Sequence, residues 1–128
     1  MRYTLLLYYP EMTADELGPE ALADGMSAFR AYAKALDDAG ALASAEVLAQ
    51  SGSTTTITLK GGELVVQDGP FADTKEQLGG SFVIDVADLD AAIEWARRAP
   101  SAAWGHVEIR PTATRYTDGA WQGQQPVA

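Results

Sequence analysis

Along this chain of 128 residues, segments with the apolar pattern of a strand and segments with that of a helix are separated by turn residues. An apolar and aromatic run over residues 3–9 stops at Pro10, and its length and tyrosines favour a buried strand. After Pro19, apolar residues recur every three or four positions until Gly40, which is typical of one face of a helix. That stripe comprises Leu22, Met26, Phe29, Ala33 and Leu36.

The middle of the chain predicts extended segments. Residues 41–49 are extended in pattern, and residues 53–60 alternate with many threonines. Gly61 and Gly62 then provide a tight turn into residues 63–67. We expect a β-hairpin here.

The pattern changes again in the second half of the chain. Residues 75–78 suggest one helical turn, and the apolar residues of 81–86 predict a central strand buried on both faces. Asp88 is a suitable N-cap for a second helix, and residues 104–110 predict a last strand. The core stripe expected for that helix is Leu89, Ile93 and Ala96.

These elements predict the order strand, helix, strand, inserted hairpin, strand, helix, strand. Two βαβ halves on one sheet form an α+β fold. The length suits one domain over residues 1–111. Residues 112–128 shift to Thr, Gly, Gln and Pro, which predicts a tail that either frays or is held on the domain or a partner subunit through Tyr116 and Trp121.

Composition narrows the classes of partner. The chain carries 18 acidic and 9 basic residues, a formal charge of −9, which opposes binding to nucleic acids or anionic membranes. Cysteine is absent, which excludes disulfides and thiol catalysis. No apolar run is long enough for a membrane span, and the N-terminus lacks the pattern of a signal peptide. We therefore predict a cytoplasmic protein.

The segment over residues 68–80, DGPFADTKEQLGG, carries the most specific signal. Gly69-Pro70 forces a bend, and charged groups follow it within a few residues. The segment resembles the signature of the DGPF branch of the YCII-related domain family. The resemblance continues at residues 2–8, 88–92 and 107–111, and so covers nearly all of the chain except the tail.

This resemblance implies a ferredoxin-like βαβ-βαβ fold with an inserted β-hairpin, assembled as a dimeric α+β barrel. It also implies a family whose biochemical role is mostly undefined. We expect a homodimeric domain that binds a small molecule in a cleft of the sheet, and a regulatory role is the first hypothesis for it. Members of the DGPF branch resemble proteins associated with alternative sigma factors, so a regulatory protein is a further partner to consider. The alternative is a cofactor-independent, lyase-like or isomerase-like enzyme acting on a small cyclic metabolite.

Asp68 and His106 are the candidate catalytic residues. Asp68 could serve as the acid/base, because partial burial at a strand end raises a carboxyl pKa, or it could simply form an Asx turn. His106 is the sole histidine and could exchange protons near neutral pH, or it could simply face a sheet surface. Other branches of the family place a proposed catalytic histidine on the first helix, but residues 19–39 contain none.

Tyr8, Phe71, Lys75 and Arg110 are the candidate ligand-binding residues. Lys75 could hold a carboxylate of the ligand, or it could pair with a neighbouring acid at the surface. Tyr8 and Arg110 could line the open face of the sheet, and ordinary packing is the alternative for both. Phe71 belongs to the same bend as Asp68.

No metal or cofactor site is expected. A single histidine without cysteine is a poor ligand set for zinc or iron. The glycine pairs at residues 61–62 and 79–80 do not fit either phosphate-loop pattern.

Overall fold

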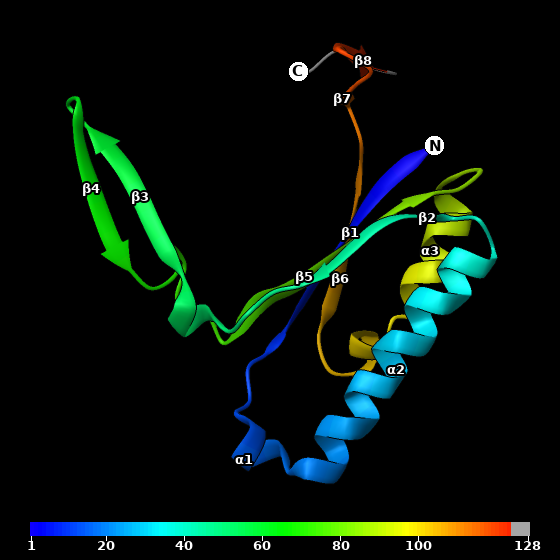
Figure 1. Ribbon diagram of the computed structural model, residues 1–128, viewed down its shortest axis with the longest axis horizontal. Coiled ribbons are helices and arrows are strands. Elements are labelled where there is room, and N and C mark those ends of the chain that lie inside the picture. The colour runs from blue at the N-terminus through cyan, green and yellow to red at the C-terminus, as the bar shows by residue number, and fades with distance from the viewer. Residues whose placement is uncertain (124–128) are drawn as a thin grey trace.

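A computed structural model describes residues 1–123 as one four-stranded sheet with helices on one face and two β-hairpins beside it (Figure 1). The elements, in chain order, are β1 (Arg2–Pro10), α1 (Ala14–Leu17), α2 (Pro19–Asp38), β2 (Leu42–Val47), the 3-10 turn η1 (Ser51–Ser53), β3 (Thr55–Lys60), β4 (Glu63–Asp68), β5 (Glu76–Asp85), α3 (Leu89–Arg97), the 3-10 turn η2 (Pro100–Ala103), β6 (His106–Pro111), β7 (Thr114–Thr117) and β8 (Ala120–Gly123).

The main sheet has the strand order β2-β5-β1-β6. Each neighbouring pair in it is antiparallel, and β1 lies inside the sheet between β5 and β6. Helix α2 connects β1 to β2, and α3 lies between β5 and β6 in the chain. The α+β class predicted from the sequence is confirmed.

The core lies between this sheet and its helices. Alternate residues of β1 point into it, and Tyr3, Leu5 and Leu7 are 3%, 0% and 1% exposed. Phe82 and Ile84 of β5 join them from the neighbouring strand. This alternation is the period-2 pattern of a strand that is covered on one face. The residues that lie between the buried ones in β1 therefore project from the other face of the sheet.

Helix α2 packs through a residue that the apolar stripe did not include. Tyr32 is buried, contacts Phe82 edge to face, and donates a hydrogen bond of 2.7 Å from its hydroxyl to the carbonyl of Trp95 in α3. Burial raises the pKa of Tyr32 to about 12, against the opposing effect of the Arg98 guanidinium. At the other end of the stripe, Leu22 and Met26 are exposed, so the predicted stripe is wrong there.

Helix α3 begins as predicted but buries a different face. The Asp88 carboxylate accepts a hydrogen bond of 2.9 Å from the Ala91 amide, which confirms the N-cap. Ala92 and Ala96 are buried, whereas Leu89 and Ile93 are exposed. The expected stripe is therefore right only for Ala96. The small alanine side chains allow the helix backbone to approach the sheet closely.

We expect Asp88→Ala to lower the free energy of unfolding by about 1 kcal/mol, because the Ala91 amide loses its acceptor. Urea denaturation would measure the change. Asp90→Ala is the matched control, since Asp90 lies in the first turn of the same helix without being its cap. Equal losses in the two variants would contradict the assigned cap.

Strand β5 begins earlier than the sequence predicts. Residues 76–78 pair with β1, with Glu76 opposite Pro10 and Gln77 opposite Tyr9. The helical turn predicted over residues 75–78 is therefore wrong, because hydrogen bonds to a distant strand override a weak local preference.

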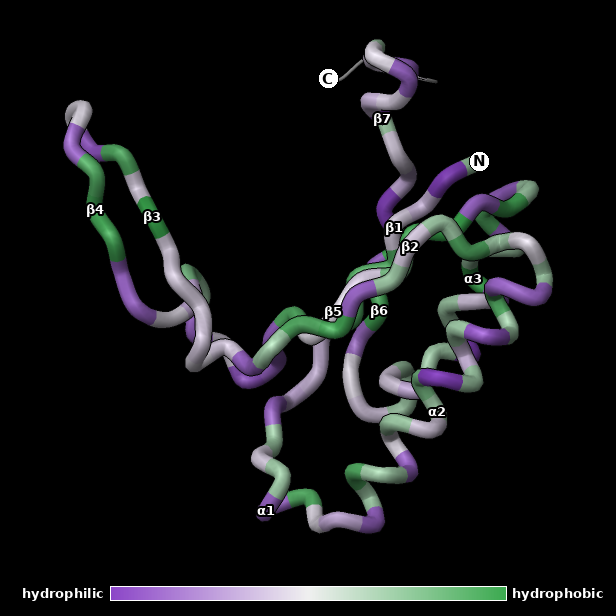
Figure 2. Tube along the Cα trace, in the orientation of Figure 1, coloured by the Kyte–Doolittle hydropathy of each residue, from purple (hydrophilic) through white to green (hydrophobic). Residues whose placement is uncertain are grey.

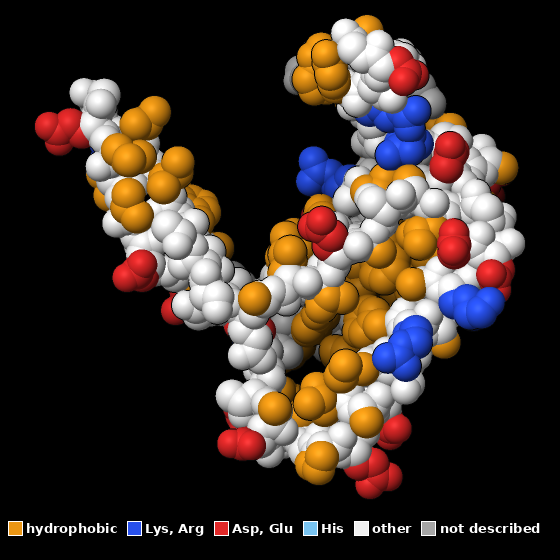
Figure 3. Space-filling model, in the orientation of Figure 1, with side chains coloured by type: hydrophobic (Ala, Val, Ile, Leu, Met, Phe, Trp, Pro, Cys, Tyr) orange, Lys and Arg blue, Asp and Glu red, His pale blue; other side chains and the backbone are white. Residues whose placement is uncertain are grey.

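The predicted hairpin at residues 61–62 is confirmed, and it stands away from the main sheet (Figure 1). Its cross-strand pairs place one set of aliphatic side chains on a single face, where all are 59–71% exposed in the single chain. Hydrophobic positions along this arm are visible in Figures 2 and 3. The residues of this apolar hairpin face are Ile57, Leu59, Leu64 and Val66.

The C-terminal segment forms a second small hairpin, β7–β8, up to Gly123. Asp118 and Gly119 make its turn with φ values of 54° and 77°, the left-handed backbone that an Asp-Gly pair accommodates. Tyr116 and Trp121 pack on each other edge to face, with ring centroids 5.5 Å apart, and both stay exposed. The rest of the predicted tail lies outside the described residues.

Candidate functional site

The main sheet has one face without helices, which we call the open sheet face. Thr4, Leu6 and Tyr8 alternate with the buried core residues of β1 and are half-buried on this face. Tyr8 lies opposite His106 of β6 and opposite Leu78 of β5. Because directly opposed residues of antiparallel strands project to the same face, Tyr8 and His106 are neighbours on the open sheet face.

His106 is hydrogen-bonded to a carboxylate from another strand. Its Nδ1 lies 2.8 Å from Oε1 of Glu76, the first residue of β5. The Glu76 side chain is 32% exposed, whereas that of His106 is 78% exposed. A carboxylate oxygen can only accept, so Nδ1 carries the hydrogen, and the neutral ring then offers Nε2 as an acceptor. Within residues 1–123, Nε2 makes no hydrogen bond and is available to a ligand.

Three strands meet at this point because glycines allow a close approach. A Cβ on Gly105 would lie 2.0 Å from the Tyr8 carbonyl oxygen, and one on Gly79 would lie 2.1 Å from the Tyr9 ring. The register of β1 with β5 also shifts between Leu7 and Tyr8, as in a β-bulge. The bulge and the glycines together bring Glu76 and His106 to the same end of β1.

Tyr9 supports the site from the side next to the helices. Its ring contacts Trp104 edge to face, with centroids 5.2 Å apart. Burial raises the pKa of the Tyr9 hydroxyl, and the Glu11 carboxylate raises it further. Glu11 also accepts a hydrogen bond of 2.6 Å from the Ser51 amide, which fixes the start of the hairpin arm to the end of β1.

The bend after β4 is held by backbone groups and the Thr56 hydroxyl rather than by Asp68. The Gly69 amide donates to the Thr54 carbonyl at 2.8 Å, and the Thr56 hydroxyl donates to the Gly69 carbonyl at 2.8 Å. Gly69 has a φ of 101°, which an L-residue rarely adopts. The Asp68 carboxylate is exposed, and no hydrogen bond to it occurs within residues 1–123, which leaves the Asx turn unsupported.

Gln77 holds the loop that follows this bend. Its side-chain amide donates to the carbonyls of Ala72 and Thr74, both at 3.0 Å. Phe71 is 89% exposed, and Lys75 is exposed without a carboxylate within 4 Å among residues 1–123. The Lys75 ammonium is therefore available to a ligand, next in the chain to Glu76.

The structure thus brings together only part of the predicted set. Tyr8 and His106 are adjacent, and Lys75 precedes the partner of His106. Arg110 lies opposite Thr4, four residues along β6 from His106, or about 13 Å at the usual rise of a strand. No hydrogen bond or ion pair within residues 1–123 joins Asp68 to His106.

Sequence reasoning missed Glu76 as a site residue. The available signal was its position at the start of a strand, which the predicted helical turn over residues 75–78 obscured. A pairing between residues 30 apart has no periodic pattern in the sequence.

Larger clusters of ligating groups do not form in the described part of the chain. No group of three or more His, Cys, Asp or Glu side chains within residues 1–123 is arranged to hold a metal ion. In the same range, no helix is long and apolar enough to cross a membrane.

These features define a class: an α+β protein with a single antiparallel main sheet, whose open face carries a histidine–carboxylate pair. The chain belongs to the YCII-related domain family, which matches residues 1–114. An uncharacterized protein of Rhizobium meliloti (strain 1021) is 36% identical over 115 residues, which cover 88% of this chain and 93% of that protein.

Proposed function

We propose that this chain is a homodimeric, small-molecule-binding domain of the DGPF branch, with its ligand site around Tyr8, His106 and Glu76. The His106–Glu76 hydrogen bond of 2.8 Å carries the proposal, because it fixes the imidazole and aims an acceptor away from the protein. Lys75 and Arg110 are the nearby cations for an acidic group of the ligand.

A ferredoxin-like fold is the architecture that we propose for the domain. The strand order β2-β5-β1-β6 and the placement of α2 and α3 between strands support two βαβ halves with an inserted hairpin. Such a sheet leaves one face without helices, and apolar side chains on that face are stabilised when a second layer covers them.

Two uncovered apolar surfaces support the dimer. The open sheet face carries Leu6, Val83 and Tyr8, which the helices of the same chain do not cover. The apolar hairpin face is exposed as well, and a two-stranded hairpin alone is at best marginally stable in water. A second copy related by a two-fold axis can cover both surfaces twice, closing a dimeric α+β barrel.

Native mass spectrometry of the purified protein, before and after exposure to a metabolite extract, tests the proposal. We expect a dimer that gains a discrete small-molecule mass. A monomer at micromolar concentration would contradict the dimer. A dimer that gains no mass from the extract would contradict ligand binding.

We expect His106→Gln to weaken retention of that ligand roughly tenfold, since one hydrogen bond contributes about 1–1.5 kcal/mol. Titration of the identified ligand into both proteins by calorimetry would measure the change. Asp68→Asn is the comparison, and we expect it to bind the ligand as the unsubstituted protein does. If Asp68→Asn weakened ligand binding and His106→Gln did not, the ligand site would instead lie at the bend that contains Asp68.

The second candidate is a cofactor-independent enzyme of the lyase or isomerase type, and the same histidine–carboxylate pair favours it. In that case Nε2 of His106, rather than Asp68, accepts a proton from the substrate and returns it. Such proton transfer typically contributes 10²–10⁴-fold to a rate. His106→Gln would then remove turnover while leaving most of the binding, which distinguishes an enzyme from a binding domain.

A further inference from the structure

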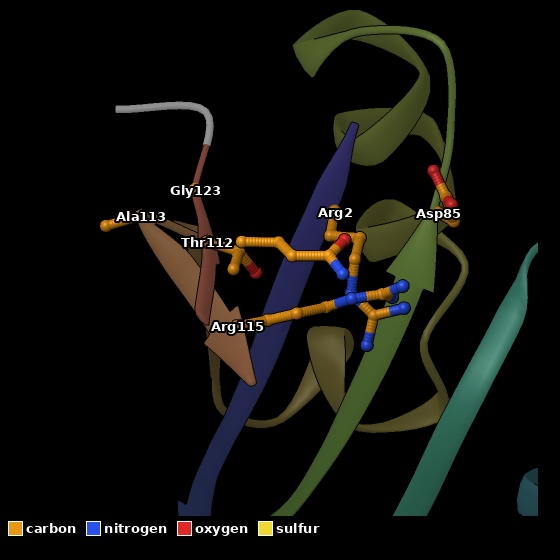
Figure 4. Close-up of a pocket in the computed structure, with 7 residues that line it drawn as sticks. Arg2, Asp85, Thr112, Ala113, Arg115 and Gly123 are labelled. Carbon is orange, nitrogen blue, oxygen red and sulfur yellow. The ribbon is translucent and has the colours of Figure 1, made fainter. Parts of the chain in front are cut away.

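A polar pocket lies at the end of β1 opposite to Tyr8 and His106, with a volume of about 340 Å³ (Figure 4). It is formed where the start of β1, the end of β5 and the β7–β8 hairpin meet. Its polar lining is Arg2, Asp85, Thr112, Arg115 and Gln122.

Two arginine side chains extend into this pocket from different elements. Arg2 comes from β1 and Arg115 from β7, and Figure 4 shows their guanidinium groups directed toward the same space. Neither has a carboxylate within 4 Å among residues 1–123. The Nε of Arg2 is buried and has no hydrogen-bond partner in that range. Two converging cations without a counter-ion repel each other, and a buried donor without an acceptor is destabilising.

Asp85 does not neutralise the pair. Its Oδ1 instead accepts from the N-terminal ammonium of Met1 at 3.2 Å, and no ion pair joins it to Arg2. The three charged side chains of the lining, two arginines and one aspartate, leave a net charge of +1 in a protein whose formal charge is −9. The pocket is therefore locally cationic, although the net charge of the whole chain is negative.

Backbone hydrogen bonds hold the C-terminal segment in place as one wall of this pocket. The Thr112 amide donates to the Arg2 carbonyl at 3.0 Å and fixes the chain after β6 to β1. Arg115 lies opposite Gln122 in the β7–β8 pair, so both side chains share the face that lines the pocket. Tyr116 and Trp121 are paired next to them and take the opposite face.

We propose that this pocket binds an oxyanion, the phosphate or carboxylate group of a small molecule. Guanidinium groups present N–H pairs whose geometry matches two oxygens of such a group, and the Arg2 Nε would gain its missing acceptor. The Gln122 amide and the Thr112 hydroxyl add neutral donors. This site is distinct from the one at Tyr8, which lies six residues along β1 from Arg2, or about 20 Å at ~3.4 Å per residue.

The test is titration of the full chain with inorganic phosphate, and separately with acetate, followed by amide NMR at constant ionic strength. We expect saturable shifts of the amides of Thr112 and Arg115. Saturation by phosphate alone, or by acetate alone, would identify which oxyanion the pocket accepts. No saturable shift with either anion would overturn the proposal.

Substitutions of Arg115 test whether the anion binds in this pocket. We expect Arg115→Gln to weaken binding tenfold or more, and Arg115→Lys, which keeps the charge but not the paired N–H groups, to weaken it less. Arg97→Gln is the matched control, because Arg97 is exposed on α3 and paired with Glu94 at 2.7 Å. Binding that is equal in Arg115→Gln and Arg97→Gln would overturn the site. His106→Gln should bind the anion normally, so this result is independent of the proposed function.

Discussion

Replacing Ile57 and Val66 together with aspartate is expected to convert the proposed dimer into folded monomers. The two residues face each other across β3–β4 and are 64% and 59% exposed in the single chain, so the substitutions remove nothing from the core of the monomer. In the proposed dimer each is buried against the second copy. Full burial of such a side chain contributes about 1.5–3 kcal/mol, and the dimer contains four of them.

The expected change is an increase of the dimer dissociation constant on the order of a thousandfold or more, because buried charges add to the lost apolar contact. Sedimentation equilibrium over a dilution series would measure it, and circular dichroism would establish that the monomer stays folded. Thr58→Asp with Gln67→Asp is the matched control, since these residues add the same charge on the opposite face of the hairpin. Equal dissociation of both double variants would show that charge alone, rather than the apolar hairpin face, is responsible.

Gly105→Ala is expected to lower the free energy of unfolding by about 2–4 kcal/mol, at the upper end for overpacking. The added Cβ would lie 2.0 Å from the Tyr8 carbonyl oxygen and 2.9 Å from the Cβ of Tyr9, so backbone rather than a flexible side chain must move. Such a movement separates β1 from β6 at His106. We therefore expect loss of the His106–Glu76 hydrogen bond as well.

Urea denaturation would measure the stability of this variant, and the imidazole resonances of His106 would report on the hydrogen bond. Gly52→Ala is the control, because a Cβ at Gly52 meets no heavy atom within 4 Å and the backbone there does not require glycine. An unchanged stability and an unchanged histidine spectrum in Gly105→Ala would contradict the close approach of the two strands.

The sequence predicted several residues of the candidate site, but it did not predict which of them pair with each other. Tyr8 and His106 were predicted separately, on the strength of residue type and position in a strand. Their adjacency follows from the antiparallel register of β1 and β6, which places residues about a hundred positions apart opposite each other. Glu76 was overlooked because its partner is 30 residues away and its neighbours carry a short helical signal.

The sequence by itself determined the features that depend on neighbouring residues: the strand β1 ending at Pro10, the Gly61-Gly62 hairpin and the Asp88 cap. Each depends on backbone geometry or on a hydrogen bond within a few residues. Only the tertiary structure decided that Tyr32 joins α2 to α3, that Glu76 holds His106, and that Arg2 and Arg115 line one pocket. These contacts depend on strand order, register and helix packing, which are set by burial over the whole chain and leave no local pattern.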